Sequence, residues 1–410
     1  MQKLLALSFV LVAAVSASAL PRVSVTDRRA AIAKDAPAAN PQGKTRIDGY
    51  GELPNVFTNS LGARFILIKP GKFIMGKAPD QGEASTHGSN HPHEVTISKP
   101  FYLGETEVTN ALHGLQAAKP DARDGAEDGE RAVAGVNYFD AIDGILRLSE
   151  KEGRRYRLPT EAEFEYAARA GTTTGWYYGN DPKRHDELEW AGHRGGEKYG
   201  DSPRPVAWKK PNPWGLYDML GNCIEYVADW AGDYPTKAVT DPTGPENADP
   251  RFPYRVKRSG GYRYGDNACY SRMIKGVDGW RNGRIGYRLA FSAADLAPVQ
   301  DREAFAALIR RQRIANFLAG TMDNPKDVRR HLAAGKVSGG WGLDWDQALE
   351  YLTKAKALDP GSQQIGDAIA AYLAFLDETE KAVDGKFKAT TDAIAAARPK
   401  IRALLTANPK

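Results

Sequence analysis

The sequence predicts an α+β domain rich in loops, followed by an all-α C-terminal helical module. Glycine supplies 41 of the 410 residues, beside 18 Tyr and 8 Trp, which is typical of a domain that has long loops and packs on aromatic rings. Short strand-like runs such as 65–68 and 94–97 lie between residues 51 and 293. From residue 295 onward the chain becomes rich in alanine and charge, with apolar residues at helical spacing.

The charge balance and the cysteine content exclude two classes of protein. Lys and Arg number 56 against 51 Asp and Glu, which leaves a net charge of +5 on 410 residues. A nucleic-acid-binding chain needs a concentrated basic patch, so no nucleic-acid partner is predicted. Two cysteines are too few for a disulfide-dense scaffold.

Residues 1–19 are predicted to be a cleaved signal peptide. Lys3 gives a positive start, residues 4–15 are apolar, and an Ala-Ser-Ala run ends at Ala19, where small residues suit a cleavage site. The apolar run of about 12 residues is shorter than the roughly 20 that a membrane span needs, although an uncleaved anchor stays an alternative. We therefore expect a periplasmic or secreted protein without a transmembrane span after cleavage. Residues 20–50 lack an apolar period and are expected to be a flexible lead-in.

Two helices are predicted within the domain at 51–293. Residues 140–152 carry apolar side chains at helical spacing, and Thr160 begins a second helix as its N-cap, with Glu163 completing a capping box. Glu161, Glu163 and Glu165 could suggest acid–base chemistry, but carboxylates at this spacing do not all share one helix face. Helix capping and a salt bridge to a core arginine are therefore predicted for them.

The segment 295–410 is predicted to form the helical module. Apolar residues define one helix face near 305–312, further faces between 349 and 376, and a last helix at about 387–405. Residues 345–375 resemble one tetratricopeptide repeat, but a single repeat is too short for a stable solenoid. Two interpretations stay open: a helical hairpin or small bundle, or a degenerate peptide-binding repeat module that mediates protein–protein contact.

A series of motifs runs through the domain in a fixed order. They comprise residues 72–76 (KFIMG), 93–97 (HEVTI), 101–110 (FYLGETEVTN), 157–171 (RLPTEAEFEYAARAG), 211–222 (PNPWGLYDMLGN), Gly260-Gly261 and 286–290 (GYRLA). Together they resemble the formylglycine-generating enzyme family, also called the sulfatase-modifying-factor family. The resemblance implies a compact, loop-rich α+β fold that is related to C-type lectins.

The resemblance also implies a structural calcium ion. In the family, calcium is held by side-chain oxygens at the positions of Asp218 and Glu225. The backbone carbonyls at Gly221 and Cys223 complete the set, and such oxygen ligands suit this hard cation. The alternative for these four residues is a hydrogen-bonded tight turn without a metal.

The catalytic centre of active family members is where this chain departs from the pattern. Active members bind Cu(I), a soft ion that prefers sulfur, through two cysteines that follow the second glycine by four and nine residues. Those positions are Gly265 and Tyr270 here, and Cys269 stands one residue short of the second. We therefore expect that the copper–cysteine oxidase centre is not retained and that copper is not bound.

The second cysteine, Cys223, leaves three alternatives open. In the family fold its loop lies near the Gly-Gly loop, so Cys223 and Cys269 could form a disulfide, remain two separate buried thiols, or act as a redox or copper pair. The third alternative would make both of them catalytic residues.

The expected function is binding of a peptide, protein or glycan ligand in the cell envelope. The candidate ligand-binding residues are Tyr262, Arg263, Tyr264, Trp280 and Arg284, whose residue types anchor recognition surfaces. Core packing is the alternative for the aromatic ones. Two other functions stay open: an oxidoreductase of the sulfatase-maturation type, which oxidises a cysteine or another residue of a target protein with a rearranged Cys223/Cys269 site, and a mainly structural envelope component.

Overall fold

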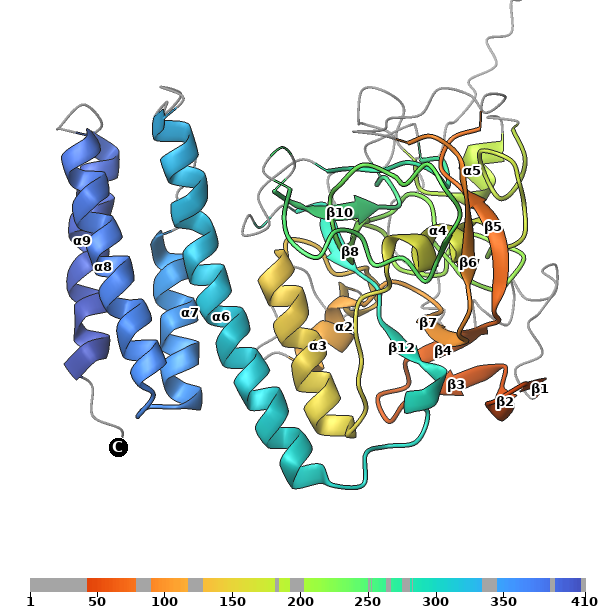
Figure 1. Cartoon of the computed structure of the whole chain (residues 1–410), viewed down its shortest axis with the longest axis horizontal. Coiled ribbons are helices and arrows are strands. Elements are labelled where there is room, and N and C mark those ends of the chain that lie inside the picture. The colour runs from red at the N-terminus through yellow and green to blue at the C-terminus, as the bar shows by residue number, and fades with distance from the viewer. Residues whose placement is uncertain are drawn as a thin grey trace, which may run out of the picture.

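The computed structural model describes most of the chain from residue 43 onward (Figure 1). The described ranges are 43–78, 90–116, 128–180, 184–191, 203–249, 251, 253–262, 267–274, 281, 283–333, 345–383 and 388–406. The predicted signal peptide lies outside these ranges, as do Arg263, Tyr264 and Trp280 of the predicted ligand surface. Within them, no helix combines the length and the apolar character that crossing a membrane requires.

The N-terminal domain is built on small sheets rather than on one large sheet. Its strands are β1 (Lys44–Ile47), β2 (Gly51–Pro54), β3 (Val56–Thr58), β4 (Arg64–Ile68), β5 (Gly71–Met75), β6 (His93–Ile97), β7 (Phe101–Gly104), β8 (Ile224–Trp230), β9 (Val239–Thr240), β10 (Arg255–Arg258), β11 (Ile285–Tyr287) and β12 (Ala290–Ser292). Among the described residues they pair in the orders β1-β2, β12-β7-β4-β3, β5-β6-β9 and β10-β8-β11. The pairs β6-β9 and β8-β11 are parallel and the others antiparallel.

The sheet that contains β4 and β7 separates two apolar clusters. Ile66 and Ile68 of β4 belong to one cluster, whereas Phe65 and Leu67 belong to the other. This division follows from the strand geometry, because successive side chains point to opposite faces. Both faces are covered, so the strand reads as a continuous apolar run instead of an alternating one.

Short helices cover these sheets. They are α2 (Asn110–Gln116), α3 (Tyr138–Glu152), α4 (Glu161–Arg169) and α5 (His185–Leu188), with 3₁₀ turns η1 (Asp128–Glu130) and η3 (Ala293–Asp295). Helix α3 begins with a capping box between Asn137 and Asp140 and ends at Gly153, whose φ of 65° favours glycine. Helix α4 begins with the predicted capping box of Thr160 and Glu163. Both predicted helices are therefore confirmed.

The C-terminal module consists of long helices that share one core. They are α6 (Arg302–Ala333), α7 (Trp345–Leu358), α8 (Gln363–Val383) and α9 (Lys388–Thr406). Helix α7 packs chiefly on α6 and α9, and apolar residues of all four helices meet in a single cluster. This arrangement agrees with the first of the two interpretations, a small helical bundle. The likeness of residues 345–375 to a tetratricopeptide repeat stays a prediction.

The helical module is docked on the N-terminal domain along α3, which runs beside α6 in Figure 1. Phe139 of α3 belongs to the apolar cluster of the module. The Tyr351 hydroxyl donates to Asn137 Oδ1 at 2.9 Å, and Arg302 Nη2 donates to the carbonyl of Lys151 in the last turn of α3 at 2.8 Å. The N-terminal domain and the helical module are therefore packed together through α3.

The prediction that residues 20–50 form a flexible lead-in is wrong for residues 44–47. These residues form β1, which pairs antiparallel with β2. Ile47 packs against the core, and Thr45 Oγ1 donates to Asn55 Oδ1 at 2.7 Å. One apolar contact and a strand partner from the next segment order this stretch, although it carries no apolar period of its own.

Candidate functional site

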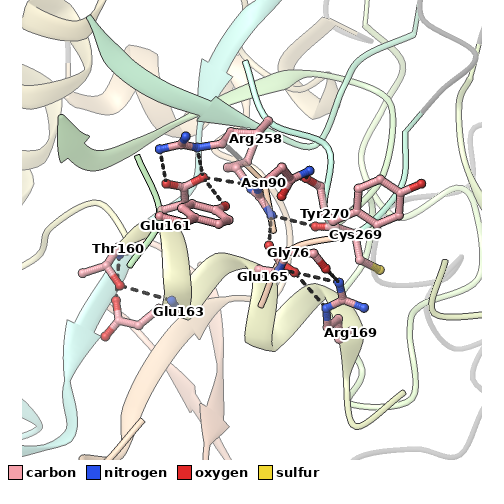
Figure 2. A network of polar contacts seen from close by, with 12 residues as sticks. Gly76, Asn90, Thr160, Glu161, Glu163, Glu165, Arg169, Arg258, Cys269 and Tyr270 are labelled. Atoms are coloured by element: carbon pink, nitrogen blue, oxygen red, sulfur yellow. Dashed lines mark hydrogen bonds and ion pairs between the residues drawn. The ribbon is translucent and has the colours of Figure 1, made fainter. Parts of the chain in front are cut away.

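An ion network that begins on α4 anchors the loop after Gly260-Gly261 (Figure 2). Arg258 of β10 donates from Nη2 to Glu165 Oε2 at 2.6 Å and to the Cys269 carbonyl at 2.7 Å. Arg169 Nε and the Gly76 amide both donate to Glu165 Oε1 at 2.9 Å. The charged side chains are buried, so charge-assisted hydrogen bonds hold the backbone at Cys269 in place.

Glu161 forms the second half of this network. Its Oε1 accepts from Arg272 Nε at 2.7 Å, from Arg258 Nη1 at 3.2 Å and from the Tyr234 hydroxyl at 3.0 Å. Glu163, on the outer face, completes the capping box and pairs with Arg157 at 2.6 Å. The predicted roles of the α4 carboxylates in capping and in salt bridges to arginines are therefore confirmed.

The two cysteines are free, buried thiols in different parts of the core. Cys269 packs in the cluster that contains α4, whereas Cys223 packs with Val206 and its Sγ donates to the Val133 carbonyl at 3.6 Å. Burial raises the pKa of Cys269 to about 12 and the pKa of Cys223 well above its usual value. Both are therefore neutral thiols near pH 7, and the disulfide alternative is not formed.

The predicted calcium residues Asp218 and Glu225 lie in a buried acidic group with Glu107. Arg288 donates to Glu225 from Nη2 at 2.9 Å and from Nε at 3.1 Å. Asp218 Oδ2 accepts from the Ala207 amide at 2.8 Å, and Glu107 Oε1 accepts from the Cys223 amide at 3.3 Å. Three carboxylates thus share one guanidinium.

The uncompensated negative charge of this acidic group is suited to binding a divalent cation. Asp218 Oδ1 and Glu107 Oε2 are buried without a hydrogen-bond partner in the described part of the chain. Burial raises the pKa of Asp218 to about 6, and burial with the neighbouring carboxylates raises that of Glu107 well above its usual value. Either protons or a cation must compensate such charges. Within the described ranges no three His, Cys, Asp or Glu side chains are arranged to hold a metal by themselves, so a cation would also need backbone carbonyls such as those of Gly221 and Cys223.

Asn222 joins three loops around the Gly-Gly motif. Its Oδ1 accepts from the Arg204 amide at 2.8 Å, and its Nδ2 donates to the Arg204 carbonyl at 3.3 Å. Its backbone amide donates to the Trp190 carbonyl and its carbonyl accepts from the Tyr262 amide, both at 3.0 Å. The segments that carry Trp190, Arg204 and Tyr262 therefore converge on one residue.

The predicted ligand-binding residues have different environments. Tyr262 is only 3% exposed, so its ring packs inside the domain. This agrees with core packing, the alternative to ligand binding that was considered for the aromatic residues. Arg284, beside β11, is half-buried. Arg263, Tyr264 and Trp280 lie outside the described residues. Among the described ranges, Arg284 is thus the member of this set that reaches the surface.

Residues 189, 190 and 208 near this loop were missed by the sequence-based prediction. Trp208 is exposed and lies 6.5 Å from Trp190 between ring centroids. Glu189 is fully buried and accepts a hydrogen bond from the Tyr178 hydroxyl. The available signal was the Trp-Lys-Lys run at 208–210, an aromatic residue within a polar, proline-bounded stretch.

Small sheets joined by long ordered loops, with buried ion networks under a Gly-Gly motif, define a domain of the sulfatase-modifying-factor type. The chain belongs to this family: the model of the sulfatase-modifying factor enzyme 1-like domain matches residues 52–293. That match covers the described domain from β2 to β12 and stops before the helical module.

Individual relatives agree with this assignment. The chain is 27% identical to the formylglycine-generating enzyme of Streptomyces coelicolor over an alignment of 326 residues, gaps included, that covers 64% of this chain and 95% of that enzyme. It is 26% identical over 265 residues to the chaperone protein LppX of Paenibacillus barcinonensis, covering 53% of this chain and 84% of LppX. Among solved structures, Treponema denticola variable protein 1 matches with a TM-score of 0.51 and 26% identity, over 58% of this chain and all of that one.

Proposed function

We propose that the chain is an exported binding protein of this family that has not retained the copper–cysteine oxidase centre. The observation that carries the proposal is the state of its cysteines. Cu(I) binding and nucleophilic chemistry both need thiolates, whereas Cys223 and Cys269 are buried, neutral and in separate clusters. A glycine stands at the first cysteine position of the active family members.

The relatives are compatible with more than one role. At nearly equal identity, one relative is named a formylglycine-generating enzyme and another a chaperone protein. The family assignment therefore does not choose between oxidation and binding, and the choice rests on the cysteines. The ligand we propose is a peptide, protein or glycan of the cell envelope, in keeping with the predicted export signal. It would contact Arg284 and the predicted residues Arg263, Tyr264 and Trp280.

A turnover assay tests the loss of the oxidase. The reduced full chain is loaded with Cu(I) and given oxygen and a Cys-x-Pro-x-Arg peptide, and mass spectrometry detects aldehyde product. We expect no product, while the Streptomyces coelicolor formylglycine-generating enzyme, as the positive control, converts the same peptide. Copper-dependent aldehyde that is lost in Cys269→Ser would overturn the proposal and favour the oxidoreductase alternative.

We also propose that calcium is bound beside Asp218 and Glu225, as a structural ion. The support is the buried acidic group, in which Arg288 offsets one of three carboxylates. When bound, calcium would supply the missing positive charge. The side chains of Asp218 and Glu225 and the carbonyls of Gly221 and Cys223 would hold it.

The calcium proposal predicts a pH-dependent stabilisation. In the metal-free chain, the pKa of Asp218 is raised from 3.8 to about 6, so the folded state binds more protons than the unfolded state in this window and stability falls as pH rises through it. Calcium competes with these protons. We therefore expect calcium to raise the unfolding temperature more at about pH 8 than at about pH 5, measured by calorimetry against EGTA.

Two variants make this measurement specific. Asp218→Asn keeps an acceptor for the Ala207 amide but removes one charge, and it should shrink the calcium effect. Asp233→Asn changes an exposed carboxylate that pairs with Arg251, and it should leave the effect intact. Equal unfolding temperatures with calcium and with EGTA at both pH values would contradict the proposal.

A further inference from the structure

Ion pairs cross the joint between α3 and the helical module. Arg313 of α6 donates from Nε to Asp143 Oδ1 at 2.8 Å, and its Nη1 lies 3.7 Å from Glu150 Oε2. Asp143 is buried and also pairs with Arg147 of α3 at 3.0 Å. Asp140, Asp143 and Glu150 follow one another at helical spacing and therefore share one face of α3. An arginine of the module thus lies against an acidic face of the N-terminal domain.

A second ionic contact crosses the joint in the opposite direction. Arg281 of the N-terminal domain donates to Asp140 at 2.7 Å and to Glu350 of α7 at 3.0 Å. Lys354 Nζ lies 2.5 Å from Glu350 Oε1, and the Tyr351 hydroxyl donates to Asp140 Oδ1 at 3.1 Å. The closed joint therefore uses ionised carboxylates on both of its sides, namely Asp140, Asp143, Glu150 and Glu350.

The N-terminal domain adds little apolar surface to the joint. Among the described residues, it contributes Phe139 to the apolar cluster of the module, and Tyr138 packs against that cluster. The domain has apolar clusters of its own. Interfaces between parts of one chain resemble transient protein–protein interfaces, and they allow relative motion unless they are large and apolar. Both cores can therefore persist when the joint opens.

The first turns of α6 depend on the joint. Among the described residues, α6 contributes to the module cluster from Ile314 onward. The preceding residues 302–313 run beside α3 (Figure 1). Phe305 in this stretch is buried and lies 5.6 Å from the guanidinium of Arg155 in the N-terminal domain. The backbone amides of 302–313 therefore report whether the joint is closed.

Protonation of the carboxylates favours the open joint. Burial raises the pKa of Asp140, but the hydrogen bond and the charge of Arg281 outweigh burial and leave this pKa below its usual value of 3.8. The pKa of Glu350 is likewise below its usual value of 4.5, because Arg281 and Lys354 outweigh burial. Glu350 loses Arg281 when the joint opens, so the open state binds protons more readily. The closed joint therefore loses stability as pH falls below these values.

His113 of α2 has an effect of the same sign beside α3. Its Nδ1 lies 3.1 Å from the Tyr287 hydroxyl of β11. Burial lowers the pKa of His113 to about 4, and the positive charge of Lys354 lowers it further. The other charges that act on this ring are those of Asp140, Asp143 and Arg147. Lys354 belongs to α7 and moves away when the module undocks, so the closed joint loses stability as pH falls from 6.5 towards about 4.

We infer that the joint between α3 and the helical module is an acid-sensitive latch, which is closed near neutral pH and opens in acid while the domain and the module stay folded. This device goes beyond the proposed binding function and does not depend on it. A proton on Asp143 would leave Arg313, whose side chain is 16% exposed, with the longer contact to Glu150. An enclosed guanidinium without a close carboxylate is costly, and opening the joint returns it to water.

The N-terminal domain responds to acid with effects of both signs. Burial raises the pKa of Asp229 to about 8, so this group adds stability to the folded domain as pH falls. The pKa of Glu165 is below its usual value of 4.5, because Arg169 and Arg258 outweigh burial, so its contribution declines below that pH. These effects offset each other in part, whereas those of Asp140, Glu350 and His113 all favour opening. Near pH 4 the joint therefore loses stability faster than the domain.

Hydrogen–deuterium exchange of the full chain at about pH 7 and about pH 4 tests the latch, with rates corrected for the intrinsic pH dependence of amide exchange. Protection of residues 302–313 should fall about tenfold in acid, whereas β4 of the domain and α8 of the module should keep theirs. Unchanged protection of 302–313 would overturn the inference. An equal loss in β4 would also overturn it, because the whole chain would then unfold in acid.

Two variants make the measurement specific. Glu350→Gln imitates the protonated carboxylate and should lower protection of 302–313 about two- to fivefold at pH 7, the usual effect of a partly exposed ion pair, with a smaller further loss in acid. Protection of α8 checks that its module is folded, and the parent chain at the two pH values carries the test independently. Glu380→Gln is the matched control. It changes a carboxylate that pairs with Arg398 within the module at 2.6 Å, and it should behave as the parent does. Equal behaviour of the two variants would overturn the latch.

Discussion

Replacing Arg258 by leucine is expected to lower the free energy of unfolding by about 3–5 kcal/mol, the usual cost of removing one partner from a buried ion pair. Arg258 is fully buried between Glu161 and Glu165. Its loss would leave Glu165 with one arginine, Arg169, and with the Gly76 amide, and would remove the hydrogen bond that Arg258 donates to the Cys269 carbonyl at 2.7 Å. The pKa of Glu165 is below its usual value because the charges of Arg169 and Arg258 outweigh the effect of burial. In the Arg258→Leu variant the buried negative charge of Glu165 would therefore be only partly compensated, by Arg169.

Urea unfolding followed by tryptophan fluorescence measures this effect. The matched control is Arg251→Leu, which removes an exposed arginine that also bridges two carboxylates, Asp233 and Asp249. Exposed pairs of this kind contribute about 0–1 kcal/mol. Similar losses of stability in both variants would show that the network around Arg258 does not stabilise the fold in the way inferred.

Replacing Tyr351 by alanine is expected to undock the helical module and to lower the free energy of unfolding by about 3–5 kcal/mol, as for other large aromatic side chains removed from a core. Tyr351 is fully buried and contacts Phe139 of α3 and Phe317 of α6. A Cβ built on Gly320 of α6 would lie 2.7 Å from the Tyr351 ring, so the helices are in close contact here.

Limited proteolysis and calorimetry detect undocking. In Tyr351→Ala we expect faster cleavage in the connection at 296–301 and two unfolding transitions in place of one. Tyr351→Phe keeps the packing and loses the hydrogen bonds that the hydroxyl donates to Asn137 and Asp140 and accepts from Gln347 Nε2, so it should cost about 1–3 kcal/mol, less than the alanine variant. A Tyr351→Ala chain that resists protease as the parent does would contradict docking through this residue.

The docked module also reaches the segment that follows the Gly-Gly loop. Arg281 donates to Asp140 of α3 at 2.7 Å and to Glu350 of α7 at 3.0 Å. Arg281 follows Trp280 of the predicted ligand surface directly in the sequence. Its side chain therefore connects this segment to both the N-terminal domain and the helical module. Undocking in Tyr351→Ala would remove Glu350 from this junction.

Several features of the chain were predictable because they depend on neighbours in sequence. The capping boxes and the ends of α3 and α4 follow from a few consecutive residues, and the ordered motifs predicted the family. The absence of a cysteine at position 265 was likewise a matter of counting from Gly261. The helical character of the C-terminal segment follows from its apolar period.

Other features depend on which distant segments meet, and the sequence carries no local signal for them. Strand β1 is ordered by its partner β2 and by the core rather than by its own period. Glu107 joins Asp218 and Glu225 from a segment more than a hundred residues earlier, and only this meeting creates an acidic group with orphaned oxygens.

The family, the helices and the departure from the family's cysteine spacing could be predicted from the sequence, because they depend on adjacent residues and fixed spacings. The separation of Cys223 and Cys269, the burial of Tyr262 and the exposure of Trp208 became known from the folded chain. The docking of the helical module on α3 also became known from the folded chain. Burial and pairing are properties of the whole packed chain, because they are set by contacts between residues that are far apart in sequence.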